Sequence, residues 1–416
     1  MEAVQPSLAL NGGAVISLGG CGENGRNCFL FTSDRGNLLL DCGVKRELGN
    51  PSEIYPALTP RIAASLDMVL LTHCHEDHCA ALPLLYAMGY TGCVYASEET
   101  IHAAPAMMRK WMKYCREHGV ALPYEDAHVQ AVRFSALQHG QNTLGAFCIL
   151  AGRSGHTVGS FWYAIGWDTR EPWPLFYSGD MCLCSATLTV DMPPRCQAAV
   201  LNSAYAAGTL KQAEQYRTLQ RIAETIVAQN GHLLLPVPSQ GRGCDMLLHL
   251  ARCFRHIPIW AEESILESLQ NLLTQSVWIR RDLPSTSLEH VRCVRTQNQR
   301  ERSCDAPYGI YLTTDGMLTT AEAHYYLQRF AKDEANGVVI SGYAAPGTPA
   351  ALLTDSAWRE KNRVMLQTFR SIIKVHLDYA DVLEVSRVLG TRQIMLFHAP
   401  QEKCCALMSA IRRAEW

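Results

Sequence analysis

The sequence lacks the features of a secreted or membrane-bound protein. Its first six residues carry no basic segment of the kind that opens a secretory signal. No apolar run approaches the roughly 20 residues that a transmembrane helix needs. Internal repeats and low-complexity segments are also missing. We therefore expect a globular protein that lies in the cytoplasm and makes no membrane contact.

A strong charge of either sign is absent as well. The chain has 37 Lys and Arg against 39 Asp and Glu, which gives a net charge of −2 at pH 7. This balance does not predict a surface that binds polyanions generally, so any nucleic-acid contact must rest on local patches. The most basic region is 280–302, with arginines at 280, 281, 292, 295, 300 and 302. Two interpretations of this region stay open: it contacts phosphate groups, or it is an exposed loop without a binding partner.

Disulfides and a nucleotide-type phosphate loop are not expected either. The 17 cysteines are odd in number and scattered, which favours reduced thiols packed in cores. Cys74 alternates with His73 and His75, so its side chain should point away from theirs. The glycine-rich stretch 19–25 lacks a following Lys-Ser/Thr and a clear helix, which favours a turn between strands.

What the sequence does contain is a dense group of histidines and acids directly after an apolar run. His73, His75, Asp77 and His78 follow residues 68–71, which read as a buried strand. His73 and His75, two residues apart, can point the same way from an extended segment. Imidazole and carboxylate together suit zinc, and incomplete protein coordination leaves room for an activated water. The spacing favours two adjacent metal ions.

Polar residues also follow other apolar stretches. Asp41 ends one of them and is either a turn residue or an anchor that orients a metal-binding histidine. His156 lies between glycines that permit close approach of backbone to an ion, which makes it a candidate third nitrogen. Asp180 ends the apolar stretch 174–177 and is suited to bridging two ions, because its carboxylate can offer one oxygen to each.

The remaining expectations concern the second half of the chain and one helix. Asp77 and His78 are expected to begin a helix that continues through 80–85. Near the C-terminus, His376 and His398 are each expected to lie on or after an apolar strand. From about residue 207, predicted helices at 211–230 and 241–254 flank a strand at 232–237. This alternation is typical of a parallel sheet and indicates a second domain.

The whole set resembles a known family. In chain order it reads Asp41, His73-x-His75-x-Asp77-His78, His156, Asp180, His376 and His398, with Gly-Tyr-Ala-Ala-Pro-Gly-Thr at 342–348. This order resembles the metallo-β-lactamase-fold nucleases with a β-CASP insertion, such as ribonuclease J and the pre-mRNA 3′-end endonuclease. The resemblance implies an α/β fold, in which residues 1–206 and 367–416 form an αββα sandwich and residues 207–366 form an inserted β-CASP domain.

The resemblance also implies residue roles. One zinc ion would be held by His73, His75 and His156, the other by Asp77, His78 and His398, with Asp180 between them and Asp41 supporting the site. His376 matches a histidine that lies near the scissile phosphate, so the expected catalytic residues are Asp77, Asp180 and His376. Substrate contacts are expected at Asn202, Ser203, Gly347 and Thr348.

The implied activity is hydrolysis of phosphodiester bonds in single-stranded RNA by a hydroxide that two zinc ions activate. In that family, histidine at the position of His398 goes with RNA substrates. Some positions depart from the family pattern: Asn202 replaces an acid, Val375 replaces a serine or glycine, and Ala350-Ala351 replaces an arginine.

Three alternatives stay open. They are a DNA nuclease of the same fold, a non-catalytic nucleic-acid-binding or scaffold subunit, and a small-molecule hydrolase of the metallo-β-lactamase fold. A homodimer and an unidentified protein partner are also left open.

Overall fold

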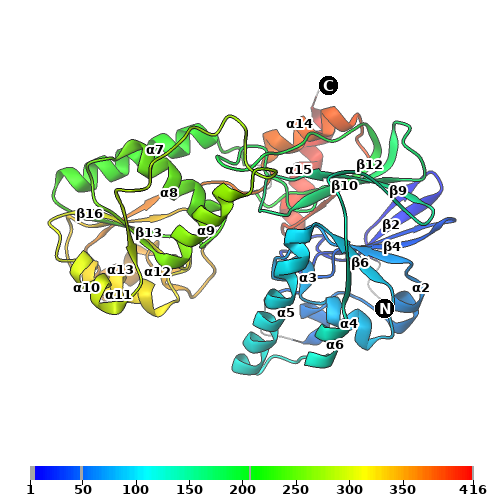
Figure 1. Ribbon diagram of the computed structural model, residues 1–416, viewed down its shortest axis with the longest axis horizontal. Coiled ribbons are helices and arrows are strands. Elements are labelled where there is room, and N and C mark those ends of the chain that lie inside the picture. The colour runs from blue at the N-terminus through cyan, green and yellow to red at the C-terminus, as the bar shows by residue number, and fades with distance from the viewer. Residues whose placement is uncertain (1–4, 47–49, 206–207, 415–416) are drawn as a thin grey trace. The chain divides into compact units, whose positions relative to one another are not determined.

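The computed structural model describes residues 5–46, 50–205 and 208–414, and its fold is α/β, as predicted (Figure 1). The chain divides into two compact units. Unit 1 comprises Met1–Leu183, Thr189–Thr209 and His376–Trp416, and unit 2 comprises Cys184–Leu188 and Leu210–Val375. The sequence predicted that the inserted domain spans residues 207–366, and these two boundaries stay predictions.

Unit 1 is built on two sheets that pack face to face. The first has the order β1 (Ser7–Leu10), β2 (Gly13–Gly19), β3 (Cys28–Ser33), β4 (Gly36–Leu40), β5 (Met68–Leu70), β6 (Cys93–Ala96) and β7 (Arg133–Ala136). Strands β1 to β4 pair antiparallel, and β4 to β7 pair parallel. The glycine-rich stretch 19–25 lies between the antiparallel pair β2 and β3, as expected of a turn.

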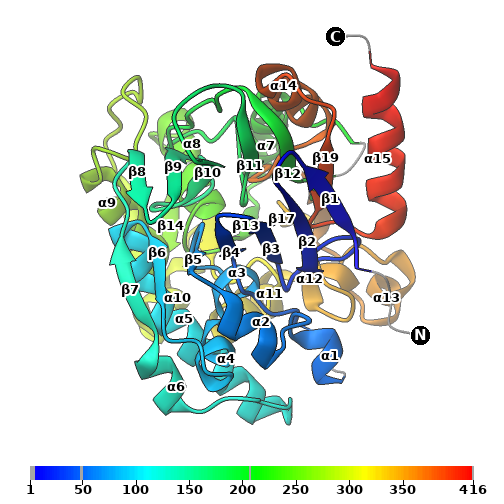
Figure 2. The same cartoon turned by 90° about the vertical axis from the view of Figure 1, so that its right-hand side faces the viewer.

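Six helices cover the outer face of this sheet (Figure 2). They are α1 (Pro51–Ile54), α2 (Pro60–Ser65), α3 (Glu76–Cys79), α4 (Leu82–Ala87), α5 (Glu98–His118) and α6 (Asp126–Ala131). The longest, α5, begins where the Ser97 hydroxyl accepts a hydrogen bond from the Thr100 N–H and ends at Gly119 in the left-handed region. Both are common ways to satisfy helix ends. No helix in the described part of the chain is long and apolar enough to cross a membrane.

The second sheet of unit 1 has the order β19 (Ile394–Phe397), β12 (Cys196–Asn202), β11 (Trp173–Tyr177), β10 (Phe161–Gly166), β9 (Phe147–Arg153) and β8 (Gly140–Leu144). Helices α14 (Tyr379–Leu389) and α15 (Gln401–Arg413) pack on its outer face. Aromatic rings pack between the two sheets. The ring centroid of Phe29 on β3 lies 5.5 Å from that of Tyr177 on β11 and 5.3 Å from that of Phe397 on β19. With helices on both outer faces, unit 1 is the predicted αββα sandwich.

Unit 2 contains one parallel sheet, as the alternation of strands and helices predicted. Its order is β15 (Val291–Val294), β14 (Ile259–Glu262), β16 (Gly309–Thr313), β13 (His232–Pro236), β17 (Gly337–Ile340) and β18 (Gln367–Arg370). Figure 1 shows α7 (Gln212–Ala228), α8 (Arg242–Cys253) and α9 (Glu263–Thr274) on one face. The other face carries α10 (Gln297–Ser303), α11 (Ala321–Phe330), α12 (Pro349–Leu352) and α13 (Ser356–Lys361).

A short excursion of the chain, Cys184–Leu188, belongs to unit 2 although the residues on both sides of it belong to unit 1. The buried carboxylate of Asp245 on α8 holds it. Asp245 accepts hydrogen bonds from the Thr187 hydroxyl at 2.5 Å and from the Ala186 N–H at 3.1 Å. Leu188 also forms a β-bridge with Ile279. The excursion is therefore an integral part of unit 2.

Two local expectations were wrong. The helix expected from Asp77 through 80–85 is two helices, α3 and α4. Pro83 lies in the first turn of α4, where its missing N–H costs no hydrogen bond, whereas inside a continuous helix it would break one. The apolar segment before His376 is not a strand, because β18 ends at Arg370 and residues 371–375 have no regular secondary structure.

Candidate metal centre

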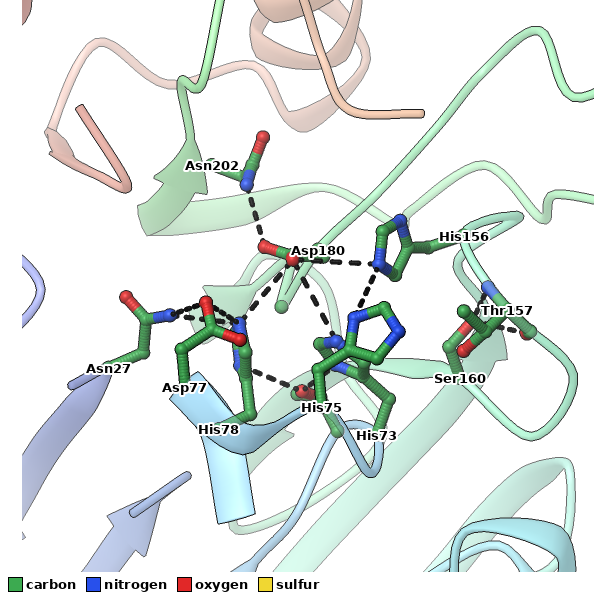
Figure 3. A network of polar contacts seen from close by, with 12 residues as sticks. Asn27, His73, His75, Asp77, His78, His156, Thr157, Ser160, Asp180 and Asn202 are labelled. Atoms are coloured by element: carbon green, nitrogen blue, oxygen red, sulfur yellow. Dashed lines mark hydrogen bonds and ion pairs between the residues drawn. The ribbon is translucent and has the colours of Figure 1, made fainter. Parts of the chain in front are cut away.

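The ends of several strands of unit 1 deliver polar side chains to one place (Figure 3). Asp41 follows β4, His73 lies three residues after β5, Asp180 three residues after β11, and His398 follows β19. Helix α3 adds Asp77 and His78, and His75 is the residue directly before its first turn. This assembly depends on close packing of α3 against the segment after β4. A Cβ atom on Gly43 would lie 1.7 Å from the Asp77 carbonyl oxygen, so only glycine fits there.

The first cluster consists of His73, His75, His156 and Asp180. One ligand atom from each lies within 4.8 Å of the others. His156 Nε2 lies 3.2 Å from His75 Nδ1 and 3.6 Å from Asp180 Oδ2. His73 Nε2 lies 3.8 Å from the same carboxylate oxygen. Three nitrogens and one carboxylate therefore face a common point.

The second cluster consists of Asp77, His78, Asp180 and His398, again with one ligand atom each inside 4.8 Å. His398 Nε2 lies 3.2 Å from Asp77 Oδ2, and His78 Nε2 lies 3.4 Å from Asp180 Oδ2. Asp180 is the member common to both clusters. The structure thus brings together the seven residues expected as ligands, and their assignment to two ions stays a prediction.

The residues present fit divalent metal ions. Buried His73 Nε2 has no hydrogen-bond partner, which is costly unless something else satisfies it. Burial, with the neighbouring imidazoles, lowers the pKa of His73 well below its ordinary value, which leaves the ring neutral and able to donate a lone pair. Burial works to raise the pKa of Asp180, but His78 and other histidines hold it well below its usual range. The neutral imidazole of His73 beside the ionised carboxylate of Asp180 is a pair of donors suited to zinc.

Asp41 is an anchor for His78. Its Oδ2 lies 2.7 Å from His78 Nδ1 and accepts hydrogen bonds from the Thr72 hydroxyl at 2.8 Å and the Tyr177 hydroxyl at 2.5 Å. Asp41 also has a positive φ of 59°, in the left-handed region. Of the two readings that the sequence left open, the side-chain contacts favour the anchor, because they direct His78 Nε2 towards the second cluster.

His376 lies beside both clusters but belongs to neither. Its Nδ1 lies 3.5 Å from Asp180 Oδ2 and 3.4 Å from the Asn202 amide nitrogen. Its ring centroid lies 4.8 Å from that of His156 and 4.9 Å from that of His398. Burial lowers the pKa of His376 well below its ordinary value, so the ring is neutral.

Two asparagines complete the polar surroundings. Asn202 donates its amide N–H to Asp180 Oδ1 at 2.7 Å, which a carboxylate at this position could not do (Figure 3). Asn27 donates to Asp77 Oδ2 at 3.2 Å and lies 2.9 Å from His78 Nε2. Sequence reasoning missed Asn27. The available signal was a polar residue directly before the apolar strand β3, and that pattern alone is too common to identify a site.

The two hydroxyls among the other expected substrate contacts make hydrogen bonds within the protein. The Ser203 hydroxyl donates to the Phe397 carbonyl at 2.7 Å. The Thr348 hydroxyl donates to the Ala345 carbonyl at 2.7 Å and caps α12, and Gly347 has a positive φ of 81°. Gly347 and Thr348 lie in unit 2. Their contact with a substrate stays a prediction.

Residues judged less promising from the sequence also have defined places. Cys74 lies in neither cluster and packs against the core beneath the first sheet. His139 Nε2 lies 2.9 Å from an Asp191 carboxylate oxygen.

Most arginines of the basic region 280–302 form ion pairs or a ring contact with other residues of this protein. Arg300 forms a buried ion pair with Glu262 at 2.8 Å. Arg280 pairs with Asp282 at 2.6 Å, Arg295 pairs with Glu263 at 2.5 Å, and the Arg292 guanidinium lies 5.2 Å above the Trp260 ring. These contacts favour a structural use of the region over a phosphate-binding patch.

Two family models match the chain. Residues 21–140 match the metallo-beta-lactamase superfamily, and residues 252–353 match the Beta-Casp domain. The first match includes His73 to His78, and the second lies inside unit 2.

Curated relatives are similar over most of the chain. Transcription termination factor FttA of Methanocaldococcus jannaschii is 25% identical, with 96% of this chain and 69% of that protein covered. Integrator complex subunit 11 of Danio rerio is 23% identical, covering 94% of this chain and 69% of that protein. Cleavage and polyadenylation specificity factor 73 of Drosophila melanogaster is 22% identical, covering 95% and 61%.

Among solved structures, the fold is similar to that of a protein of unknown function from Enterococcus faecalis V583. The TM-score is 0.59 at 12% sequence identity, covering 94% of this chain and 96% of that chain. At this identity the likeness supports the fold alone.

Proposed function

Because the chain belongs to the β-CASP family of metallo-β-lactamase-fold nucleases, which are metal-dependent phosphodiester hydrolases, we propose that it is a zinc-dependent ribonuclease acting on single-stranded RNA. The observation that carries this proposal is the pair of four-residue clusters joined by Asp180. His73, His75 and His156 would hold one ion, and Asp77, His78 and His398 the other. Asp180 would contact both. Bound there, two zinc ions would lower the pKa of a shared water and offset charge on the phosphate.

The protein's own residues would do the remaining work. Asp41 and Asn27 orient His78 and Asp77 through the hydrogen bonds described above. Asn202 keeps Asp180 fixed through its amide. His376, neutral and just outside the clusters, would present Nε2–H for a hydrogen bond to a phosphate oxygen and so offset charge there. Holding these groups in place before substrate arrives is itself a large part of catalysis.

The preference for RNA rests on two supports. His398 occupies the position at which the family resemblance associates histidine with RNA. The relatives' names refer to transcription termination, cleavage and polyadenylation, which concern transcripts. We propose that the protein acts in the cytoplasm. A homodimer or a protein partner is compatible with this function.

Cleavage of end-labelled RNA and DNA of one sequence tests the proposal. Zinc-loaded protein is expected to cut single-stranded RNA, leaving DNA intact, and Asp77→Ala should abolish cutting while the protein remains folded. Asp168→Asn, at an exposed surface pair, is the matched control. Cutting of DNA alone would replace the ribonuclease with a DNA nuclease. Absence of any cutting by protein shown to hold two zinc ions would favour a non-catalytic subunit.

A further inference from the structure

His156 is carried by the short loop between β9 and β10, residues 154–160. Two glycines allow the sharp course of this loop, since Gly155 has a φ of 72° and Gly159 a φ of 85°. Glycine also gives the unfolded backbone much freedom, and fixing it costs conformational entropy. A histidine on such a loop keeps one position only where other contacts fix the backbone around it.

The hydroxyl of Ser160 closes this loop from inside (Figure 3). It accepts hydrogen bonds from the Ser154 hydroxyl at 2.8 Å and from the Thr157 N–H at 3.0 Å. It donates to the Thr157 carbonyl at 2.7 Å. The one donor and two acceptor sites of a hydroxyl are thereby all used. Ser154 and Ser160 are 0% and 1% exposed, so these bonds are shielded from water.

The N-terminal end of α5 holds the same loop from outside. The Ser97 hydroxyl donates to the Gly159 carbonyl at 2.6 Å, and the Thr100 hydroxyl donates to the same oxygen at 2.9 Å. A carbonyl oxygen has two lone pairs, and here each receives a donor. Both hydroxyl side chains are buried. A Cβ atom on Gly159 would lie 2.9 Å from Ser97 Oγ, so glycine permits this close approach.

Helix α5 is a firm support for this contact, because it is long and its inner side is buried. It spans 21 residues, and its buried residues include Ala104, Met108, Trp111, Met112 and Cys115. These side chains pack in the core beneath the first sheet. The Ser97 hydroxyl also accepts a hydrogen bond from the Thr100 N–H at 3.2 Å, so it caps the helix as well. The loop is thus tied to a well-packed helix end.

The two sets of hydrogen bonds meet next to His156. Thr157, which is bonded to Ser160, directly follows His156. Ser160 in turn directly follows Gly159, which α5 holds. His156 is 5% exposed, and its Nε2 lies 3.2 Å from His75 Nδ1. Little freedom is therefore left for the backbone that carries this imidazole. All of these residues belong to unit 1.

We propose that Ser97 and Thr100 are positioning residues for His156 and, through it, for metal binding by the first cluster. They act on the loop backbone and not as ligands. A ligand that is already held in place binds an ion more tightly, because less conformational entropy is lost on binding. The effect on metal binding rests on the proposed function of the metal centre, whereas the position of the imidazole in the metal-free protein does not.

Zinc titration of the full-length protein against a chelator tests the proposal. The parent is His398→Ala, which removes a ligand of the second cluster and leaves the first cluster intact. In this parent, Ser97→Ala with Thr100→Val is expected to weaken zinc binding about 10-fold. Thr100→Ser keeps the hydroxyl and should leave the affinity unchanged. Equal zinc affinity in the variant without both hydroxyls and in its parent would overturn the proposal.

A matched control separates positioning from helix stability. Thr59→Ala removes the cap hydroxyl of α2, which accepts a hydrogen bond from the Ile62 N–H at 3.2 Å, and it should leave zinc affinity unchanged. If it weakens zinc binding as much as the changes at Ser97 and Thr100, the effect is general destabilisation and the proposal is overturned.

A single variant provides the test if the double variant does not fold. Thr100→Val keeps the size of the side chain and the Ser97 cap, and it removes one of the two donors to the Gly159 carbonyl. Zinc binding should again weaken, and an affinity equal to that of the parent would then count against the proposal.

A readout independent of metal and substrate separates this proposal from the proposed function. In ¹⁵N-histidine NMR spectra of the metal-free protein, assigned with His156→Asn, the changes at Ser97 and Thr100 should shift the His156 resonances and leave those of His398 in place. If the protein cuts no nucleic acid but the His156 resonances shift, the ribonuclease proposal fails and the positioning role stands. If they stay in place, the positioning role is refuted.

Discussion

Replacement of Asp41 by asparagine tests the anchoring of the metal centre most directly. Oδ2 of Asp41 receives three groups within 2.8 Å, namely His78 Nδ1, the Thr72 hydroxyl and the Tyr177 hydroxyl. Asp41→Asn keeps the shape and one oxygen but removes the charge. In the orientation that keeps Oδ1 as the acceptor for the Thr72 N–H, an amide NH₂ faces those three donors.

The magnitude follows from the loss of a buried, charged acceptor. Hydrogen bonds to charged groups contribute about 1.5–3 kcal/mol each, and breaking a buried charged pair costs about 3–5 kcal/mol. We expect Asp41→Asn to lower the free energy of unfolding of the metal-free protein by about 3–5 kcal/mol. Because His78 loses its orientation, zinc affinity should fall about 10- to 100-fold.

Urea unfolding and zinc titration against a chelator measure the two effects separately. Tyr177→Phe is the control, because it removes one of the three hydrogen bonds and leaves the charge in place, so it should cost about 1.5–3 kcal/mol, less than Asp41→Asn. The reasoning is refuted if Asp41→Asn matches the unmodified protein in zinc affinity, or if Tyr177→Phe costs as much as Asp41→Asn.

Three further predictions concern His376, Asn202 and Asp191. His376→Ala should leave zinc content unchanged and lower kcat about 100-fold or more, and loss of zinc would instead make His376 a ligand. Asn202→Asp should lower the unfolding free energy of the metal-free protein by about 1–3 kcal/mol, because a donor to Asp180 becomes a second carboxylate, and thermal unfolding with and without zinc would show it. Burial works to raise the pKa of Asp191, but hydrogen bonds from Arg153 lower it to about 2, so its stabilisation is present above pH about 4 and is lost as the pH falls towards 2. Urea unfolding at pH 7, 4 and 3 should therefore show a cost for Asp191→Asn that shrinks on acidification.

Features with a local cause could be predicted from the sequence. The apolar runs before His73 and Asp180 indicated strands, and the density of ligands indicated two metal sites, because both signals lie within a few neighbouring residues. The assignment of roles to His156, His376 and His398 depended on the family resemblance. Spacing alone does not say which distant residues meet.

Other features depend on tertiary contacts that no local pattern encodes. Asn27 reaches Asp77 across 50 residues of sequence. The apolar residues Ile372, Ile373 and Val375 suggested a strand, but on one side the hydrogen bonds of the segment 371–374 go to glutamine side chains. The break between α3 and α4 had a local signal in Pro83, which the periodicity of the surrounding apolar residues outweighed.

The Cys184–Leu188 excursion limits how this protein can be taken apart. The chain passes between the two units at 183/184, 188/189, 209/210 and 375/376, so unit 2 is not one continuous stretch. A recombinant fragment of 210–375 alone would leave the Asp245 carboxylate without the donors of Ala186 and Thr187. Exchange of this unit between relatives would succeed only if the five-residue excursion is transplanted with it.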